Sequence, residues 1–170
     1  MKKRTLRLLL WSACDRACAG CCNNDWNLDA LPIVIDFDGF DEVILTGGEP
    51  MLNPQRVIET IKRVRAQTDV PIYVYTAKVT DISAALGVLR ACDGMTVTLH
   101  EQKDARPWAR FAREVSKRRW STGKSLRLNV FEGLDYHRDL ALVADWKTKN
   151  DIRWIADCPL PENEIFGRLS

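Results

Sequence analysis

The sequence contains no long apolar run, no internal repeat, no low-complexity tract and no linker rich in glycine or serine. A membrane-spanning helix needs about 20 consecutive apolar residues, and no stretch approaches that length. The formal net charge is only +2, so the strongly basic balance of many nucleic-acid-binding proteins is missing as well. We therefore expect a single domain over residues 1–170, with neither a nucleic acid nor a membrane as partner.

An export signal is not expected either. Basic residues at positions 2–4 are followed by several leucines, which is how a signal peptide begins. Arg7 interrupts the apolar run, however, and leaves about six apolar residues where a signal sequence needs about 7–15. We expect a cytoplasmic protein.

What the sequence does have is a cluster of cysteines. Four of the six lie within residues 14–22. A disulfide framework would spread its cysteines along the chain to close loops, so this clustering favours a metal site. The isolated Cys92 and Cys158 are expected to be small core residues, and core packing is also expected for Trp11, Trp108 and Trp154.

Apolar segments with strand character alternate with segments of helical period. The expected strands are residues 6–12, 42–46, 71–76, 95–99, 126–131 and 151–155. The expected helices are residues 54–67, 82–92, 105–120 and 138–148, the first with Asn53 as its cap and Pro54 at its first position. No long helix is expected in residues 25–40.

This alternation predicts parallel strands joined by right-handed crossovers. A closed eight-stranded barrel normally needs about 250 residues, so the chain is too short for one. The predicted fold is α/β, a partial (βα)6-like open barrel with a parallel sheet, and a doubly wound sheet is the alternative. In both, ligands bind at the carboxyl ends of the strands.

The cysteine cluster directly follows the first expected strand. Cys14, Cys18 and Cys21 have the spacing C-x3-C-x2-C, and three thiolates so spaced can hold a [4Fe–4S] cluster. The fourth iron would then have no protein ligand, and an open coordination position can do chemistry. Structural zinc, with Cys22 as a fourth ligand, is the alternative.

A second motif follows the second expected strand. Gly47, Gly48, Glu49 and Pro50 should therefore lie at the same edge of the sheet as the cysteines. Glycines let backbone groups approach a ligand closely, and the Glu49 carboxylate could pair with a cationic amine. The plainer interpretation is a turn followed by a helix.

Together these motifs resemble the radical S-adenosylmethionine superfamily, whose members have C-x3-C-x2-C after the first strand and a GGEP-like motif after the second. The resemblance implies a [4Fe–4S] cluster on Cys14, Cys18 and Cys21. It also implies S-adenosylmethionine bound at the open iron, with Gly47, Gly48 and Glu49 positioning its amine. One-electron reduction by an external flavodoxin- or ferredoxin-type donor would release a 5′-deoxyadenosyl radical, which abstracts hydrogen from a substrate.

Further cofactor contacts follow from the resemblance by strand position. Thr76 ends the third expected strand, where a polar residue meets the methionyl group. Thr98 and His100 lie at the end of the fourth, where the ribose is held, and Asn129 on the fifth could reach the nucleoside. A histidine exposed at a strand end is the alternative for His100.

One branch of the superfamily resembles this chain most in the cysteine loop. Activating enzymes of anaerobic ribonucleotide reductases have a glycine before the third cysteine, then an asparagine and a nearby tryptophan. Gly20, Asn23 and Trp26 match that pattern, although many other members have an aromatic residue at the position of Gly20. The resemblance implies a large glycyl-radical protein as partner. A small-molecule substrate, such as a nucleobase or a deazapurine precursor, is one alternative, and a non-catalytic iron–sulfur or zinc module is another.

Overall fold

The computed structural model describes residues 3–136 and 143–170 and has an α/β fold. Its strands are β1 (Thr5–Leu9), β2 (Glu42–Thr46), β3 (Ile72–Thr76), β4 (Gly94–Leu99), β5 (Ser125–Phe131), β6 (Lys147–Ile152) and β7 (Glu164–Arg168). They form one sheet in the order β6-β5-β4-β3-β2-β1-β7, and every pairing is parallel. This open parallel sheet is consistent with the predicted partial barrel.

Five of the predicted strands correspond to β1–β5, and two features of the sheet differ from the prediction. The sixth strand was expected at 151–155, but β6 runs from Lys147 to Ile152. β7 was not predicted at all. It pairs with β1 from Thr5↔Glu164 to Leu9↔Arg168, so the first strand is an interior strand of the sheet.

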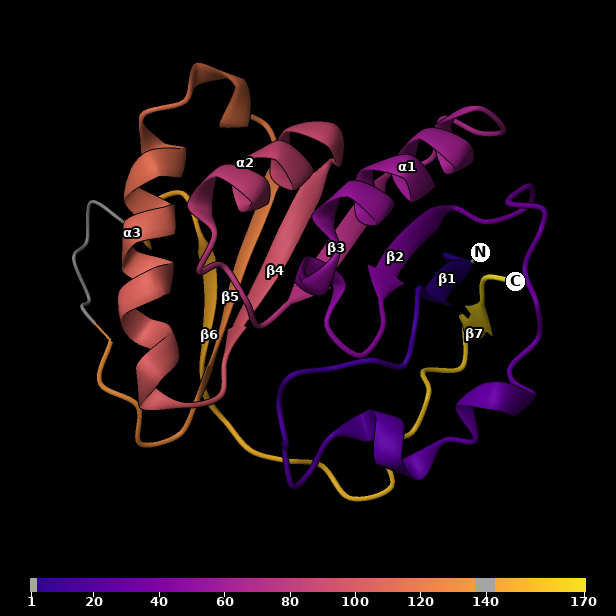
Figure 1. Cartoon of the computed structure of the whole chain (residues 1–170), viewed down its shortest axis with the longest axis horizontal. Helices are drawn as coiled ribbons and strands as arrows, with labels where there is room; N and C mark the ends of the chain where they lie inside the picture. Colours follow the sequence, from indigo (N-terminus) through magenta and orange to yellow (C-terminus); the bar gives the residue numbers. More distant parts are fainter. Residues whose placement is uncertain (1–2, 137–142) are drawn as a thin grey trace.

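Within the described residues, three α-helices connect the strands and lie on one side of the sheet (Figure 1). They are α1 (Pro54–Arg65), α2 (Ile82–Ala91) and α3 (Ala105–Ser116). Asn53 caps α1 as predicted, because its side chain accepts a hydrogen bond from the backbone N–H of Arg56. Asp81 caps α2 in the same way through Ala84.

Two predicted helices end differently. The helix expected at 105–120 stops at Ser116, and Arg119–Ser121 forms a separate 3-10 turn. Of the helix expected at 138–148, residues 138–142 lie outside the described residues, while residues 147 and 148 belong to β6. The long interval after β1 has no α-helix, as expected, and contains the 3-10 turns Cys22–Asp25 and Leu28–Ala30.

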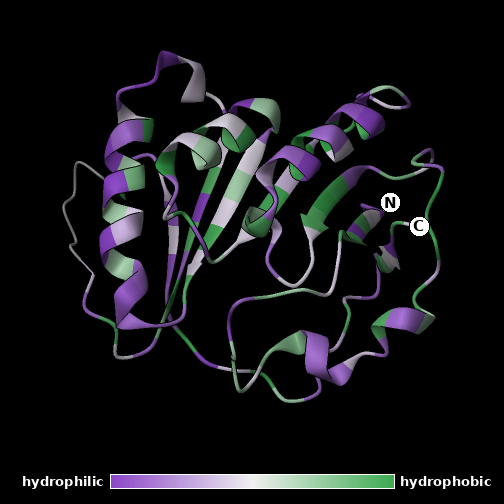
Figure 2. Cartoon of the chain, viewed as in Figure 1, coloured by the Kyte–Doolittle hydropathy of each residue, from purple (hydrophilic) through white to green (hydrophobic). Residues whose placement is uncertain are grey.

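The hydrophobic core lies between the helices and the face of the sheet that they cover. Leu6, Leu8, Val74 and Val97 point into it from the strands, and Trp108 points into it from α3. β3 and β5 alternate between buried and less buried residues, because only one face of the sheet meets the helices. Figure 2 shows the same division, with hydrophobic strands and hydrophilic outer faces on the helices.

Cys92 is 1% exposed and belongs to this core, as predicted. Trp11 is partly buried and packs against the core, while Trp108 is fully buried within it. Trp154 is 42% exposed, so the prediction of a core residue is wrong there. In the ranges 3–136 and 143–170, no helix has the length and apolar character needed to cross a membrane.

Candidate functional site

The carboxyl ends of the strands border a cavity of about 560 Å³. That volume is within the range of about 300–1,000 Å³ that is usual for small-molecule sites. Its lining includes nearly all the residues predicted for the site: Cys14, Cys18, Cys21, Gly47, Gly48, Glu49, Pro50, Thr76, Thr98 and His100. Asn129 pairs with Thr98 in the sheet but is not among the lining residues. Four separate strand ends therefore bring the predicted residues to one place.

The three predicted cysteine ligands are free thiols at this cavity. Cys14 is exposed, while Cys18 and Cys21 are half-buried. Burial raises the pKa of the Cys14 thiol. It also raises the pKa of Cys18, although the nearby Arg16 guanidinium opposes that shift. A bound metal would reverse this tendency, because a coordinating thiol is deprotonated.

The three thiols do not form a ready-made site for a single metal ion. Within the described residues, no three Cys, His, Asp or Glu side chains are gathered closely enough to share one metal ion. In a [4Fe–4S] cluster each thiolate binds a different iron, so its ligands do not have to meet at a point. Cys14, Cys18 and Cys21, which line the same cavity, are the residues that could hold such a cluster.

The two motifs are joined by backbone hydrogen bonds. The N–H of Gly48 donates to the Trp11 carbonyl at 2.7 Å, and the N–H of Glu49 donates to the Ala13 carbonyl at 2.9 Å. The Asn23 side chain donates to the Gly47 carbonyl at 2.9 Å. The cysteine loop is thereby fixed against the end of β2 at both its beginning and its end.

This junction explains the two glycines. A Cβ at position 47 would lie 2.8 Å from the Trp11 carbonyl oxygen, and one at Gly48 would collide with the Ala13 carbonyl. We expected the glycines to give room to a ligand. The structure shows that they first give room to the neighbouring backbone of the cysteine loop.

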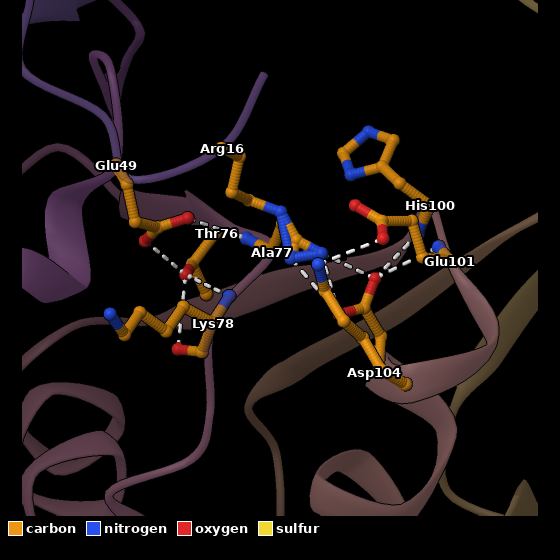
Figure 3. Close-up of polar contacts among 9 residues, drawn as sticks. Arg16, Glu49, Thr76, Ala77, Lys78, His100, Glu101 and Asp104 are labelled. Atoms are coloured by element: carbon orange, nitrogen blue, oxygen red, sulfur yellow. Dashed lines mark hydrogen bonds and ion pairs between the residues drawn. The ribbon is translucent and has the colours of Figure 1, made fainter. Parts of the chain in front are cut away.

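Glu49 is 2% exposed and its carboxylate is engaged within the chain (Figure 3). Oε1 accepts hydrogen bonds from the Thr76 hydroxyl at 2.5 Å and from the N–H of Met51 at 2.8 Å. Oε2 accepts one from the N–H of Ala77 at 3.0 Å. Burial raises the pKa of Glu49, while these donors oppose the shift. The side chain thus connects the ends of β2 and β3, and Oε2 retains one acceptor position.

Arg16 connects the cysteine loop to the loop after β4 through a buried ion pair. Its guanidinium bonds both oxygens of Asp104 at 2.5–2.9 Å, and the two side chains are only 9% and 7% exposed. Asp104 also accepts from the N–H groups of His100 and Glu101, each at 3.0 Å. Figure 3 shows Arg16 and Glu49 on adjacent sides of the site.

An aromatic cluster forms a further wall. His100 stacks on Trp154, with ring centroids 5.1 Å apart and an interplanar angle of 4°. Phe131 contacts both rings. Burial, followed by the charge of Arg16, lowers the pKa of His100. Trp154 lies against Gly20, where a Cβ would meet its ring at 2.5 Å. The contact with Trp154 therefore explains why a residue without a side chain is needed at position 20.

Cys22 and Cys158 form a disulfide across 136 residues of sequence. Cys158 is half-exposed rather than a core residue, so that prediction is wrong. Both residues line the cavity. The structure also assigns Cys22 a partner other than a metal ion.

Arg16 and Trp154 were not predicted as site residues. The position of Arg16 inside the cysteine loop was a usable signal, because a cation there is close to any bound thiolates. Trp154 gave no local signal, since only the fold brings it to Gly20. No protein-family model and no curated protein matches the chain.

Proposed function

We propose that the chain is a radical S-adenosylmethionine enzyme, with Cys14, Cys18 and Cys21 as ligands of a [4Fe–4S] cluster. The observation that supports this most is the shared cavity, in which these thiols and Gly47, Gly48 and Glu49 border the same space. The two motifs are 26 residues apart at their nearest (Cys21 and Gly47). Direct hydrogen bonds between them make one composite site.

When bound, the cluster and S-adenosylmethionine supply a 5′-deoxyadenosyl radical that abstracts hydrogen from the substrate. The chain's own residues hold and orient these groups. The Gly47 carbonyl and Oε2 of Glu49 each retain an acceptor position suited to an ammonium group. Thr76 orients Glu49, and the His100–Trp154 wall shields one side of the cavity from water.

For the reaction type we propose hydrogen abstraction of the glycyl-radical activase kind. Gly20, Asn23 and Trp26 support this branch by their positions in the cysteine loop. The partners would be a flavodoxin- or ferredoxin-type electron donor and a large glycyl-radical protein. A small molecule such as a nucleobase or deazapurine precursor is the alternative substrate.

Anaerobic reconstitution with iron and sulfide tests the chemistry. We expect a brown protein that releases 5′-deoxyadenosine from S-adenosylmethionine when dithionite is added. Cys18→Ala should abolish release, whereas Cys92→Ala, the matched change at a buried cysteine of the helix-covered core, should retain it. A colourless wild-type protein with stoichiometric zinc would instead support the non-catalytic zinc module.

The substrate class needs a separate measurement. Co-expression with a large glycyl-radical protein encoded beside this gene should give a stable glycyl radical detectable by electron paramagnetic resonance. Release of 5′-deoxyadenosine without such a radical, but accelerated by a purine-like compound, would favour the small-molecule alternative.

A further inference from the structure

One wall of the cavity comes from the segment between β6 and β7. Trp154, Cys158 and Leu160 all line the cavity, and Figure 1 shows this segment in yellow beneath the strand ends, beside the indigo segment that follows β1. Across the described residues, positions 154–160 make no hydrogen bond to any other part of the chain.

The segment is therefore held by a small number of contacts. The covalent contact is the Cys22–Cys158 disulfide. The others are the packing of Trp154 on Gly20, His100 and Phe131 and that of Leu160 beside Leu9 and Phe166. Trp154 is 42% exposed, so its packing covers only part of the ring.

We propose that Cys22 and Cys158 form a reversible redox site that fastens this wall to the cysteine loop. In the oxidised state the sulfur–sulfur bond holds residues 154–160 over the cavity. A dithiol, such as that of a thioredoxin-type protein, breaks that bond by transferring two electrons and two protons to the pair. The products are the two free thiols of the chain and the disulfide of the reductant.

The position of the pair suits thiol–disulfide exchange. Cys22 is exposed and Cys158 half-exposed, and exchange requires an attacking thiolate to reach a sulfur atom. Cys92 offers the contrast within the same chain, because burial raises the pKa of its thiol to about 11. Its folded-state thiolate is disfavoured, so Cys92 stays protonated and unreactive at neutral and mildly alkaline pH.

Reduction should therefore free the wall without disturbing the sheet. Before the segment, Arg153 forms an exposed ion pair with Glu132 just after β6. After it, the next backbone hydrogen bond to the sheet is at Asn163, whose carbonyl accepts from the N–H of Thr5. A chain section between two fixed ends becomes locally mobile when its cross-link is removed. This goes beyond the proposed function, since it holds whatever ligand occupies the cavity.

Disulfide mapping and limited proteolysis of the purified full chain test the proposal. After oxidation with glutathione disulfide and alkylation, mass spectrometry should identify a peptide pair joined through Cys22 and Cys158. Reduction with a phosphine should then accelerate chymotryptic cleavage after Trp154, inside the segment, by roughly tenfold or more. The C22S/C158S variant should be cleaved at the fast rate in both conditions, while C92A should respond to reduction as the wild type does.

Three outcomes would overturn the proposal. The first is a mapped disulfide that does not join Cys22 to Cys158. The second is equal cleavage after Trp154 before and after reduction. The third is loss of bound iron in C22S/C158S after reconstitution, which would make these cysteines metal ligands. Failure of the radical chemistry would leave the mapped pair and the proteolysis result intact, so the two proposals fail separately.

Discussion

Gly48 shows how a single residue connects the two motifs of the site. Its N–H donates to Trp11, and its missing Cβ leaves space for the Ala13 carbonyl. Only a residue without a side chain permits this approach of two backbones. The glycine is therefore needed for the protein to assemble the site before any ligand binds.

Gly48→Ala should destabilise the fold by about 1–3 kcal/mol, because the new methyl group forces the cysteine loop away from β2. Gly87→Ala in α2 is the matched control, since its Cβ would meet only the Ile58 Cδ1 atom at 4.0 Å. That change should stabilise the helix by up to about 1 kcal/mol. Urea unfolding of both variants measures the contrast, and equal stabilities would contradict this role of Gly48.

The cysteine loop is held in place by two neighbouring elements. Backbone hydrogen bonds and Asn23 hold it to the end of β2, and Arg16 holds it to the loop that leads into α3. Because Asp104 also accepts two backbone N–H groups, the ion pair organises the start of α3 as well as the loop.

Asp104→Asn should cost about 3–5 kcal/mol, because it leaves the buried Arg16 guanidinium without a counter-charge. Glu114→Gln is the control, since the Lys117–Glu114 pair is 58% and 31% exposed and its loss should cost less than about 1 kcal/mol. The free energy of unfolding at neutral pH distinguishes the two. A cost for Asp104→Asn no greater than that of Glu114→Gln would argue against a bracing role.

Across the whole molecule, the sequence predicts the strands and helices that have a strong hydrophobic pattern and misses those that have a weak one. The apolar run of β2 and the capped, periodic α1 are encoded locally. β6, with the sequence KTKNDI, is an exposed edge strand with little apolar character. β7 has only Ile165 and Phe166 as a strand signal, and Gly167 within it is required because a Cβ would collide with Val34. Strands with so little apolar pattern form because they pair with neighbouring strands, and their own sequence does not predict them.

The residues of the site also fall into a group that the sequence predicts and a group that it does not. The three cysteines and the glycine motif could be found because each is contiguous and follows a strand whose end faces the same edge. The contacts of Trp154 with Gly20 and of Cys158 with Cys22 join positions more than 130 residues apart. No local pattern encodes such pairs, and the sheet order that brings them together depended on the unpredicted β7.

The proposed function requires that Cys14, Cys18 and Cys21, and not Cys22, hold an iron–sulfur cluster at this cavity. Iron content after anaerobic reconstitution tests it most directly. We predict about four irons per chain in the wild type and in Cys22→Ala, and almost none when Cys14, Cys18 and Cys21 are all changed to alanine. Iron retained by the triple variant, or lost from Cys22→Ala, would contradict this assignment of the ligands.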